Sequence, residues 1–143
     1  MTFRLEVAVV PVSNLDKALE FYVDKFGFNL DVDYRPTDDF AVVQLTPPGS
    51  ECSIHLQQTP GDNVEAVTHY LVVDDIQAAQ RELAGRGAPV ADLRHKSPLA
   101  TWSGGFADGP DPERRDYATF ADVTDPDGNL WVLQERGFSS ATP

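Results

Sequence analysis

Apolar and polar positions along the first half of the chain predict strands on either side of one helix. The valine-rich stretch from Phe3 to Val12 alternates imperfectly and predicts a strand covered on both faces. Apolar residues then recur every three or four positions until Gly27, which predicts an amphipathic helix of about three turns with Ser13 or Asn14 as its N-cap. Three further strands are expected over residues 28–34, 40–45 and 52–57.

The second half repeats the first, because residues 12–15 (VSNL) align with residues 73–76 (VDDI) and Gly27 aligns with Gly87. The breaker-rich segment 58–65 separates the two repeats. We therefore expect a single domain over residues 1–143 that contains an internal repeat. Its two copies are expected over residues 1–58 and 66–136.

Within the second repeat, the pattern predicts a strand, a helix and a further strand before it becomes irregular. These elements are expected over residues 68–73, 75–84 and 90–94. The glycines and prolines between Arg94 and Asp116 predict a loop without regular structure. Loops of this length within compact domains are often lids over a site.

The stretch DPDGNLWVLQE, from Asp125 to Glu135, closes the second repeat. Its proline, two carboxylates and glycine favour a tight reversal of the backbone. The apolar run after it predicts a buried strand, with residues 117–123 as its hairpin partner.

Two βαβββ units closed in this way resemble the vicinal oxygen chelate superfamily of glyoxalases, bleomycin-resistance proteins and extradiol dioxygenases. The segments that carry the resemblance are LEVAVVPVSNLDKALEFYVDKFGF, HYLVVDDIQAAQRELAGRGAPV and DPDGNLWVLQE. The resemblance implies an α+β fold. In that fold each repeat curls into a half-barrel, and the concave faces enclose a pocket for a ligand or a metal.

Metal-using members of the superfamily place ligands on the first and last strands of each unit. The resemblance puts these positions at Val7, His55, Thr68 and Val132. Valine has no lone pair to donate and threonine is a poor ligand, whereas a divalent ion usually takes at least three protein ligands. We therefore expect no bound metal and no cofactor.

The same positions instead predict an apolar pocket with a few polar groups, which is the usual lining of a small-molecule site. Two large apolar side chains in the long loop are candidates for a lid, because something must cover them. Two aromatic residues of the following strand are weaker candidates, for which core packing is an equal alternative. The candidate ligand-binding residues are Val7, Val9, His55, Thr68, Tyr70, Trp102, Phe106, Tyr117, Phe120 and Val132.

Basic residues stand at both ends of the long loop, at positions 94–96 (RHK) and at Arg114 and Arg115. They could meet an anionic group on a ligand, but ion pairs with neighbouring carboxylates such as Asp111 are the preferred interpretation. Cys52 and His55 lie three residues apart and would point to opposite faces of a strand, which disfavours a nucleophile and its base.

The composition and net charge of the chain disfavour some kinds of binding partner. A hydrophobic content of 41% against 24% charged residues is ordinary for a globular protein. The net charge of −12 opposes binding to nucleic acid and to anionic membranes. A lone cysteine and the absence of a signal-peptide pattern predict a cytoplasmic protein. Exposed sheet edges, together with the resemblance, predict a homodimer.

Three classes of function remain open from the sequence. The first is a metal-independent protein that sequesters an apolar or aromatic, antibiotic-like small molecule. The second is an enzyme, a lyase, isomerase or dioxygenase that acts on a small oxygenated substrate through a metal or with His55 as base. A purely structural or regulatory interaction domain is the third, and its concave faces would be filled with side chains.

Overall fold

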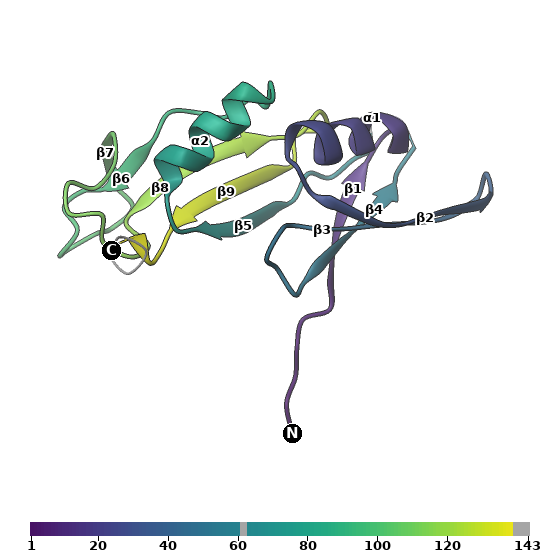
Figure 1. Cartoon of the computed structure of the whole chain (residues 1–143), viewed down its shortest axis with the longest axis horizontal. Helices are drawn as coiled ribbons and strands as arrows, with labels where there is room; N and C mark the ends of the chain where they lie inside the picture. The colour runs from purple at the N-terminus through teal and green to yellow at the C-terminus, as the bar shows by residue number, and fades with distance from the viewer. Residues whose placement is uncertain (61–62, 139–143) are drawn as a thin grey trace. The chain divides into compact units, whose positions relative to one another are not determined.

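The computed structural model describes residues 1–60 and 63–138, which form two compact units (Figure 1). The first unit comprises the described residues of Met1–Val67 together with the turn Asp125–Asn129. The second comprises Thr68–Thr124 and the described residues from Leu130 onward. Each unit contains one mixed sheet.

In the first unit, the sheet has the strand order β1-β4-β3-β2. β1 and β4 are parallel and the other neighbours are antiparallel. Helix α1 (Leu15–Leu19) continues into a π-helical segment, η1 (Glu20–Lys25). The strands are β1 (Val7–Val12), β2 (Asn29–Thr37), β3 (Phe40–Thr46) and β4 (Ser53–Gln58).

The α1–η1 segment begins where the sequence predicts, with Asn14 as N-cap: its side chain accepts a hydrogen bond from the Lys17 amide at 3.0 Å. The wider π-helical turn brings the Phe26 amide to within 2.9 Å of the Phe21 carbonyl oxygen. Phe21, Tyr22 and Phe26 are all at most 8% exposed and pack with Phe28. These aromatic rings form the core between the helix and the sheet.

In the second unit, the sheet has the strand order β5-β9-β8-β6-β7, and β5 and β9 are parallel. Without β7, this is the connectivity of the first unit, so the two sheets show the same βαβββ order that the sequence repeat predicts. The elements are β5 (Thr68–Val73), α2 (Ile76–Gly85), β6 (Arg94–Lys96), β7 (Phe106–Asp108), β8 (Thr119–Thr124) and β9 (Leu130–Glu135).

One face of each sheet is covered by its own helix (Figure 1). In the first unit α1 packs against β4, and Val10, Val12 and Leu56 on that face are at most 1% exposed. In the second unit α2 packs against β8 and β9, and Leu133 and Ile76 are buried between them. Because side chains alternate along a strand, every second residue points to the opposite face of the sheet, which we call the open face.

The expectation of an irregular loop over residues 94–116 is wrong. β6 and β7 pair antiparallel within it, with Arg94 opposite Asp108 and Lys96 opposite Phe106. Glycine here permits the strands to approach rather than preventing them from pairing, because a Cβ on Gly105 would lie 2.9 Å from the Ser97 carbonyl oxygen.

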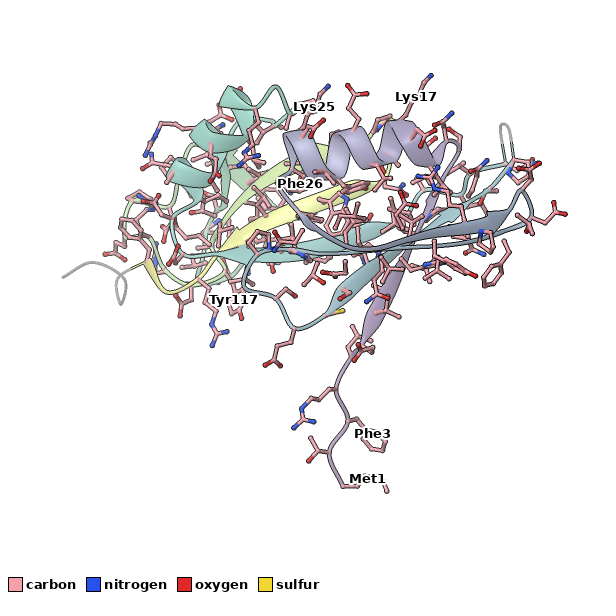
Figure 2. All side chains as sticks on the ribbon, turned by 45° about the vertical axis from the view of Figure 1, so that its right-hand side comes forward. Met1, Phe3, Lys17, Lys25, Phe26 and Tyr117 are labelled. Carbon is pink, nitrogen blue, oxygen red and sulfur yellow. The ribbon has the colours of Figure 1, made fainter. Side chains whose placement is uncertain are left out.

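Several predicted boundaries also change. The first strand begins at Val7, not Phe3, whose side chain is 87% exposed on the extended N-terminal segment (Figure 2). Of the strand expected over 90–94, the structure shows an isolated bridge from Val90 to Val123 and the first residue of β6, Arg94. Tyr117 precedes β8 with a φ of 58°, a left-handed conformation that cannot continue a strand.

The DPDG turn forms as predicted, and the Asp125 carboxylate is its organising group. Asp125 is 5% exposed and accepts hydrogen bonds from the backbone amides of Asp127 and Asn129 at 2.9 and 2.8 Å. It also accepts a bond from the Tyr22 hydroxyl at 2.6 Å. Gly128 has a φ of 86°, which the turn requires and glycine adopts freely.

We predict that Asp125→Ala lowers the free energy of unfolding by about 3 kcal/mol, because it leaves buried donors without their acceptor. Denaturant unfolding of the variant and the native protein measures this. Asp127→Ala is the matched control: within the described part of the chain its carboxylate accepts one hydrogen bond, from the Ser13 amide at the surface, so the expected loss is below about 1 kcal/mol. Equal losses for the two variants would contradict the role assigned to Asp125.

Candidate functional site

On the open face of the second sheet, strand pairing brings predicted site residues from β5, β8 and β9 together. Tyr70 lies opposite Val132, and Phe120 lies opposite Gln134, two residues along β9. Thr68 lies two residues before Tyr70 on the same face. Tyr70 is 62% exposed, whereas Val132 and Phe120 are 4% and 6% exposed. Tyr70 therefore offers an accessible ring, and Val132 and Phe120 form the floor beside it.

The same face continues onto β6 and β7, where five side chains form what we call the Trp102 cluster: Arg94, Lys96, Trp102, Phe106 and Phe120. The Trp102 and Phe106 ring centroids are 5.6 Å apart, and those of Phe106 and Phe120 are 5.8 Å apart. The Trp102 indole nitrogen donates to the Gly105 carbonyl oxygen at 2.6 Å, which fixes the orientation of its ring. Trp102 and Phe106 remain 39% and 45% exposed, so neither is a core residue.

Both cations of the cluster lie over aromatic rings. The Arg94 guanidinium is 4.9 Å from the Phe106 centroid and 5.5 Å from the Phe120 centroid. The Lys96 ammonium is 4.5 Å from the Trp102 centroid and 5.6 Å from the Phe120 centroid. These distances are in the range of favourable cation–π contacts.

At the far end of the 94–116 segment, the predicted ion pairs are confirmed for Arg115. Its guanidinium lies 2.7 Å from Asp111 and 3.2 Å from Glu113. The hydrogen bonds from Arg115 lower the pKa of the buried Asp111 carboxyl to about 2. Arg115 therefore anchors the chain that leads into β8.

Arg114 has a different partner, which the sequence did not indicate. It donates to Glu135, a fully buried carboxylate at the end of β9 that also accepts from the Ile76 amide at 2.9 Å. The hydrogen bond with Glu135 raises the pKa of Arg114. The position of Glu135 directly after an apolar run is the feature of the sequence that could have indicated a buried ion pair.

In the first unit, the predicted residues Val7, Val9 and His55 share the open face of the sheet, with Val9 opposite His55. Val7 and Val9 are 37% and 44% exposed, and His55 is half-buried beside Gln44. His55 also lines a cleft of about 730 Å³ at the β2–β3 hairpin. The other residues that line it are Leu15, Arg35, Thr37, Asp38, Asp39, Phe40, Ala41, Leu56, Gln57, Gln58 and Pro60.

This cleft has the volume of a small-molecule site but a mostly polar lining, and of the predicted residues only His55 contributes to it. Arg35 in its wall is already bound to Asp16 and Asp33, both at 2.8 Å, and these hydrogen bonds raise its pKa. The exposed aromatic surface of the Trp102 cluster is the stronger candidate for binding an apolar ligand, because burying apolar area supplies the main driving force.

The positions that the resemblance assigns to metal ligands do not hold residues that fit a divalent ion. Val7 and Val132 have no donor atoms, and within residues 1–60 and 63–138 no three His, Cys, Asp or Glu side chains are grouped so as to hold a metal.

His69, His95 and Tyr117 lie away from the open face or contact other groups of the protein. His69 lies on the helix side of its sheet with its ring 5.2 Å from Trp131, which is 2% exposed and belongs to the core. His95 Nδ1 is 2.8 Å from the Gly109 carbonyl oxygen. Tyr117 is 40% exposed outside β8 and is not brought onto the open face by strand pairing.

The fold and these faces define a protein of two βαβββ units, each with an open sheet face. The sequence profile of the Glyoxalase/Bleomycin resistance protein/Dioxygenase superfamily matches residues 4–133, and the chain belongs to this superfamily. Its sheets of four and five strands match the two half-barrel modules of that α+β fold, as predicted. A comparison with curated proteins finds no match.

Solved structures of similar proteins cover nearly the whole chain. TnmS3, an antibiotic binding protein from Streptomyces sp. CB03234, is 28% identical over 94% of this chain and 96% of its own, with a TM-score of 0.66. A glyoxalase/bleomycin resistance protein from the same organism is 28% identical over 92% of this chain and 100% of its own, with a TM-score of 0.64.

A third similar structure is that of a superfamily member from Sphaerobacter thermophilus DSM 20745. It is 24% identical over 94% of this chain and 98% of its own, with a TM-score of 0.66, and supports the fold alone. In the part of the chain that the structure describes, no helix has the length and apolar character needed to cross a membrane.

Proposed function

We propose that the protein binds an apolar or aromatic, antibiotic-like small molecule and sequesters it without a metal. The observation that carries this proposal is the Trp102 cluster, in which two partly exposed aromatic rings lie on the open face of a sheet. Large apolar side chains left against water on a rigid support favour a ligand that covers them.

The proposed binding surface also includes residues of the second sheet beside the Trp102 cluster. Tyr70 and Thr68 would contact the ligand there, and Val132 would form the floor together with Phe120 of the cluster. In the first unit, Val7, Val9 and His55 remain proposed ligand contacts because they share the corresponding open face. Tyr117 remains only a weak candidate, since the backbone places it outside β8.

Similarity to an antibiotic binding protein supports the class of ligand. TnmS3 is 28% identical to this chain over almost its full length. Sequestration requires only tight binding, so the absence of metal donors at Val7 and Val132 is compatible with it.

A homodimer and a cytoplasmic location belong to the same proposal. The strand orders leave β1 and β2 as edges of the first sheet and β5 and β7 as edges of the second. Exposed edges favour pairing with another copy of the chain or cover by it. The enzyme alternative, a lyase, isomerase or dioxygenase, would need a metal or His55 acting as base.

Trp102→Ala should weaken binding of the neutral aromatic dye N-phenyl-1-naphthylamine about tenfold, because part of the covered ring surface is lost. Stability should fall by only about 1 kcal/mol, since the side chain is partly exposed, whereas truncating the buried Trp131 should cost about 3–5 kcal/mol. Dye titration and denaturant unfolding on each variant measure both quantities.

Phe3→Ala serves as the matched control for Trp102→Ala, because Phe3 is 87% exposed in the first unit and lies outside both the Trp102 cluster and the cleft that His55 lines. It should leave dye affinity within about twofold. If Trp102→Ala instead caused a large loss of stability with dye affinity preserved, the ligand role of Trp102 would have to be abandoned.

Metal independence predicts that excess chelator leaves the melting temperature unchanged. A metal that binds only the native protein would stabilise it by RT ln(1 + [L]/Kd), so removing such a metal would lower the melting temperature. Thermal unfolding with and without chelator, alongside metal analysis of the purified protein, checks this. A drop of several degrees, or a stoichiometric transition metal, would favour the enzyme alternative.

A further inference from the structure

Lys96 is a cation without an anionic partner, placed beside the exposed rings of the Trp102 cluster. Its side chain is half-buried on β6, and its ammonium lies 4.5 Å from the Trp102 centroid. Among the residues that the structure describes, Lys96 takes part in none of the ion pairs. The other two lysines, Lys17 and Lys25, form no ion pair among the described residues either, so what distinguishes Lys96 is that its ammonium lies over the Trp102 and Phe120 rings.

The neighbouring cation on the same face shows the contrast. Arg94 lies two residues before Lys96, and its Nη1 is 3.0 Å from Asp122 Oδ1. The Arg94 charge is therefore balanced within the protein, while that of Lys96 is balanced only by ring faces. The cluster carries one uncompensated positive charge although the whole chain has a net charge of −12.

The geometry around Lys96 favours one chemical class of ligand. An ammonium has three N–H donors, and contact with an aromatic face leaves donors free for an acceptor. Trp102 is held in place by its hydrogen bond to Gly105, so the ring and the charge are preorganised next to each other. Such a pair complements a flat ring that carries an anionic oxygen group at its edge.

We infer that the ligand proposed above is an aromatic anion, whose ring packs on Trp102 and Phe106 and whose carboxylate, sulfonate or phenolate group accepts a hydrogen bond from Lys96. This inference rests on the proposed function and names its ligand class. A neutral aromatic ligand would use the rings alone and leave the Lys96 charge uncompensated.

Two dyes that differ only in their charge test the inference. 8-Anilinonaphthalene-1-sulfonate is N-phenyl-1-naphthylamine with an added sulfonate, so the ratio of their affinities isolates the contribution of the anion. Lys96→Met keeps much of the aliphatic stem and removes the charge. We expect it to weaken binding of the sulfonate dye about tenfold and to change binding of the neutral dye less than twofold.

Two further variants control for net charge and for fold. Lys17→Met makes the same charge change on α1, outside the cluster, and should leave both dye affinities unchanged. Lys96→Arg keeps the cation and should keep sulfonate-dye binding within about threefold. Raising salt should weaken sulfonate-dye binding to the native protein more than to Lys96→Met. If Lys96→Met alters the melting temperature, Lys96→Gln provides the second neutral variant.

The possible outcomes separate the two proposals. If the neutral dye binds and depends on Trp102, but neutral substitutions of Lys96 do not affect the sulfonate dye, the aromatic site stands and the anion inference is overturned. If neither dye binds the native protein, the proposed function fails and the inference fails with it. If Lys17→Met weakens the sulfonate dye as much as Lys96→Met, the effect is one of net charge, which also overturns the role of Lys96.

Discussion

The parallel pairing of the last strand of each unit with its first strand is the constraint on which the rest of the structure depends. β4 is inserted between β1 and β3, and β9 between β5 and β8. Because the side-chain period of a strand is two, this pairing decides which residues point to the helix and which to the open face. A slip of one residue in β9 would exchange the buried Leu133 for Val132 and move Gln134 into the core.

This register alone places the residues of the candidate site on one face of the second sheet. Phe120 is opposite Gln134, and Arg94 is opposite Phe120, so the open face passes from β9 through β8 to β6 in one continuous row. The short hairpin β6–β7 then adds Phe106 opposite Lys96. The result is an aromatic surface with two cations at its edge, on a chain whose overall charge is strongly negative.

Strong local signals let the sequence predict much of this fold. Asn14 and Asp75 cap their helices, accepting from the Lys17 and Ala78 amides at 3.0 and 3.1 Å. The DPDG turn and the 68–73 strand appear where composition and periodicity place them. These features depend on residues close in the chain, which is why a single sequence can indicate them.

Features that depend on pairing between distant segments were missed. β6 and β7 have three residues each, which is too few to show an alternation of apolar and polar positions. The glycines and prolines around them favour the prediction of a loop. The aromatic contacts of Lys96 follow from its register with Phe106 and from the position of Trp102, which no local pattern encodes. Glu135 is likewise the buried partner of Arg114, a residue 21 positions away in the sequence.

The central claim is that an aromatic ligand binds at the Trp102 cluster, and the two tryptophans of the chain allow a direct measurement. A two-dimensional ¹H–¹⁵N spectrum should show one indole signal from Trp102, bonded to Gly105, and one from Trp131, buried against the helix side of its sheet. With the signals assigned through Trp102→Phe, addition of 8-anilinonaphthalene-1-sulfonate should shift the Trp102 signal and leave that of Trp131 in place. An unchanged Trp102 signal at saturating dye would contradict the account.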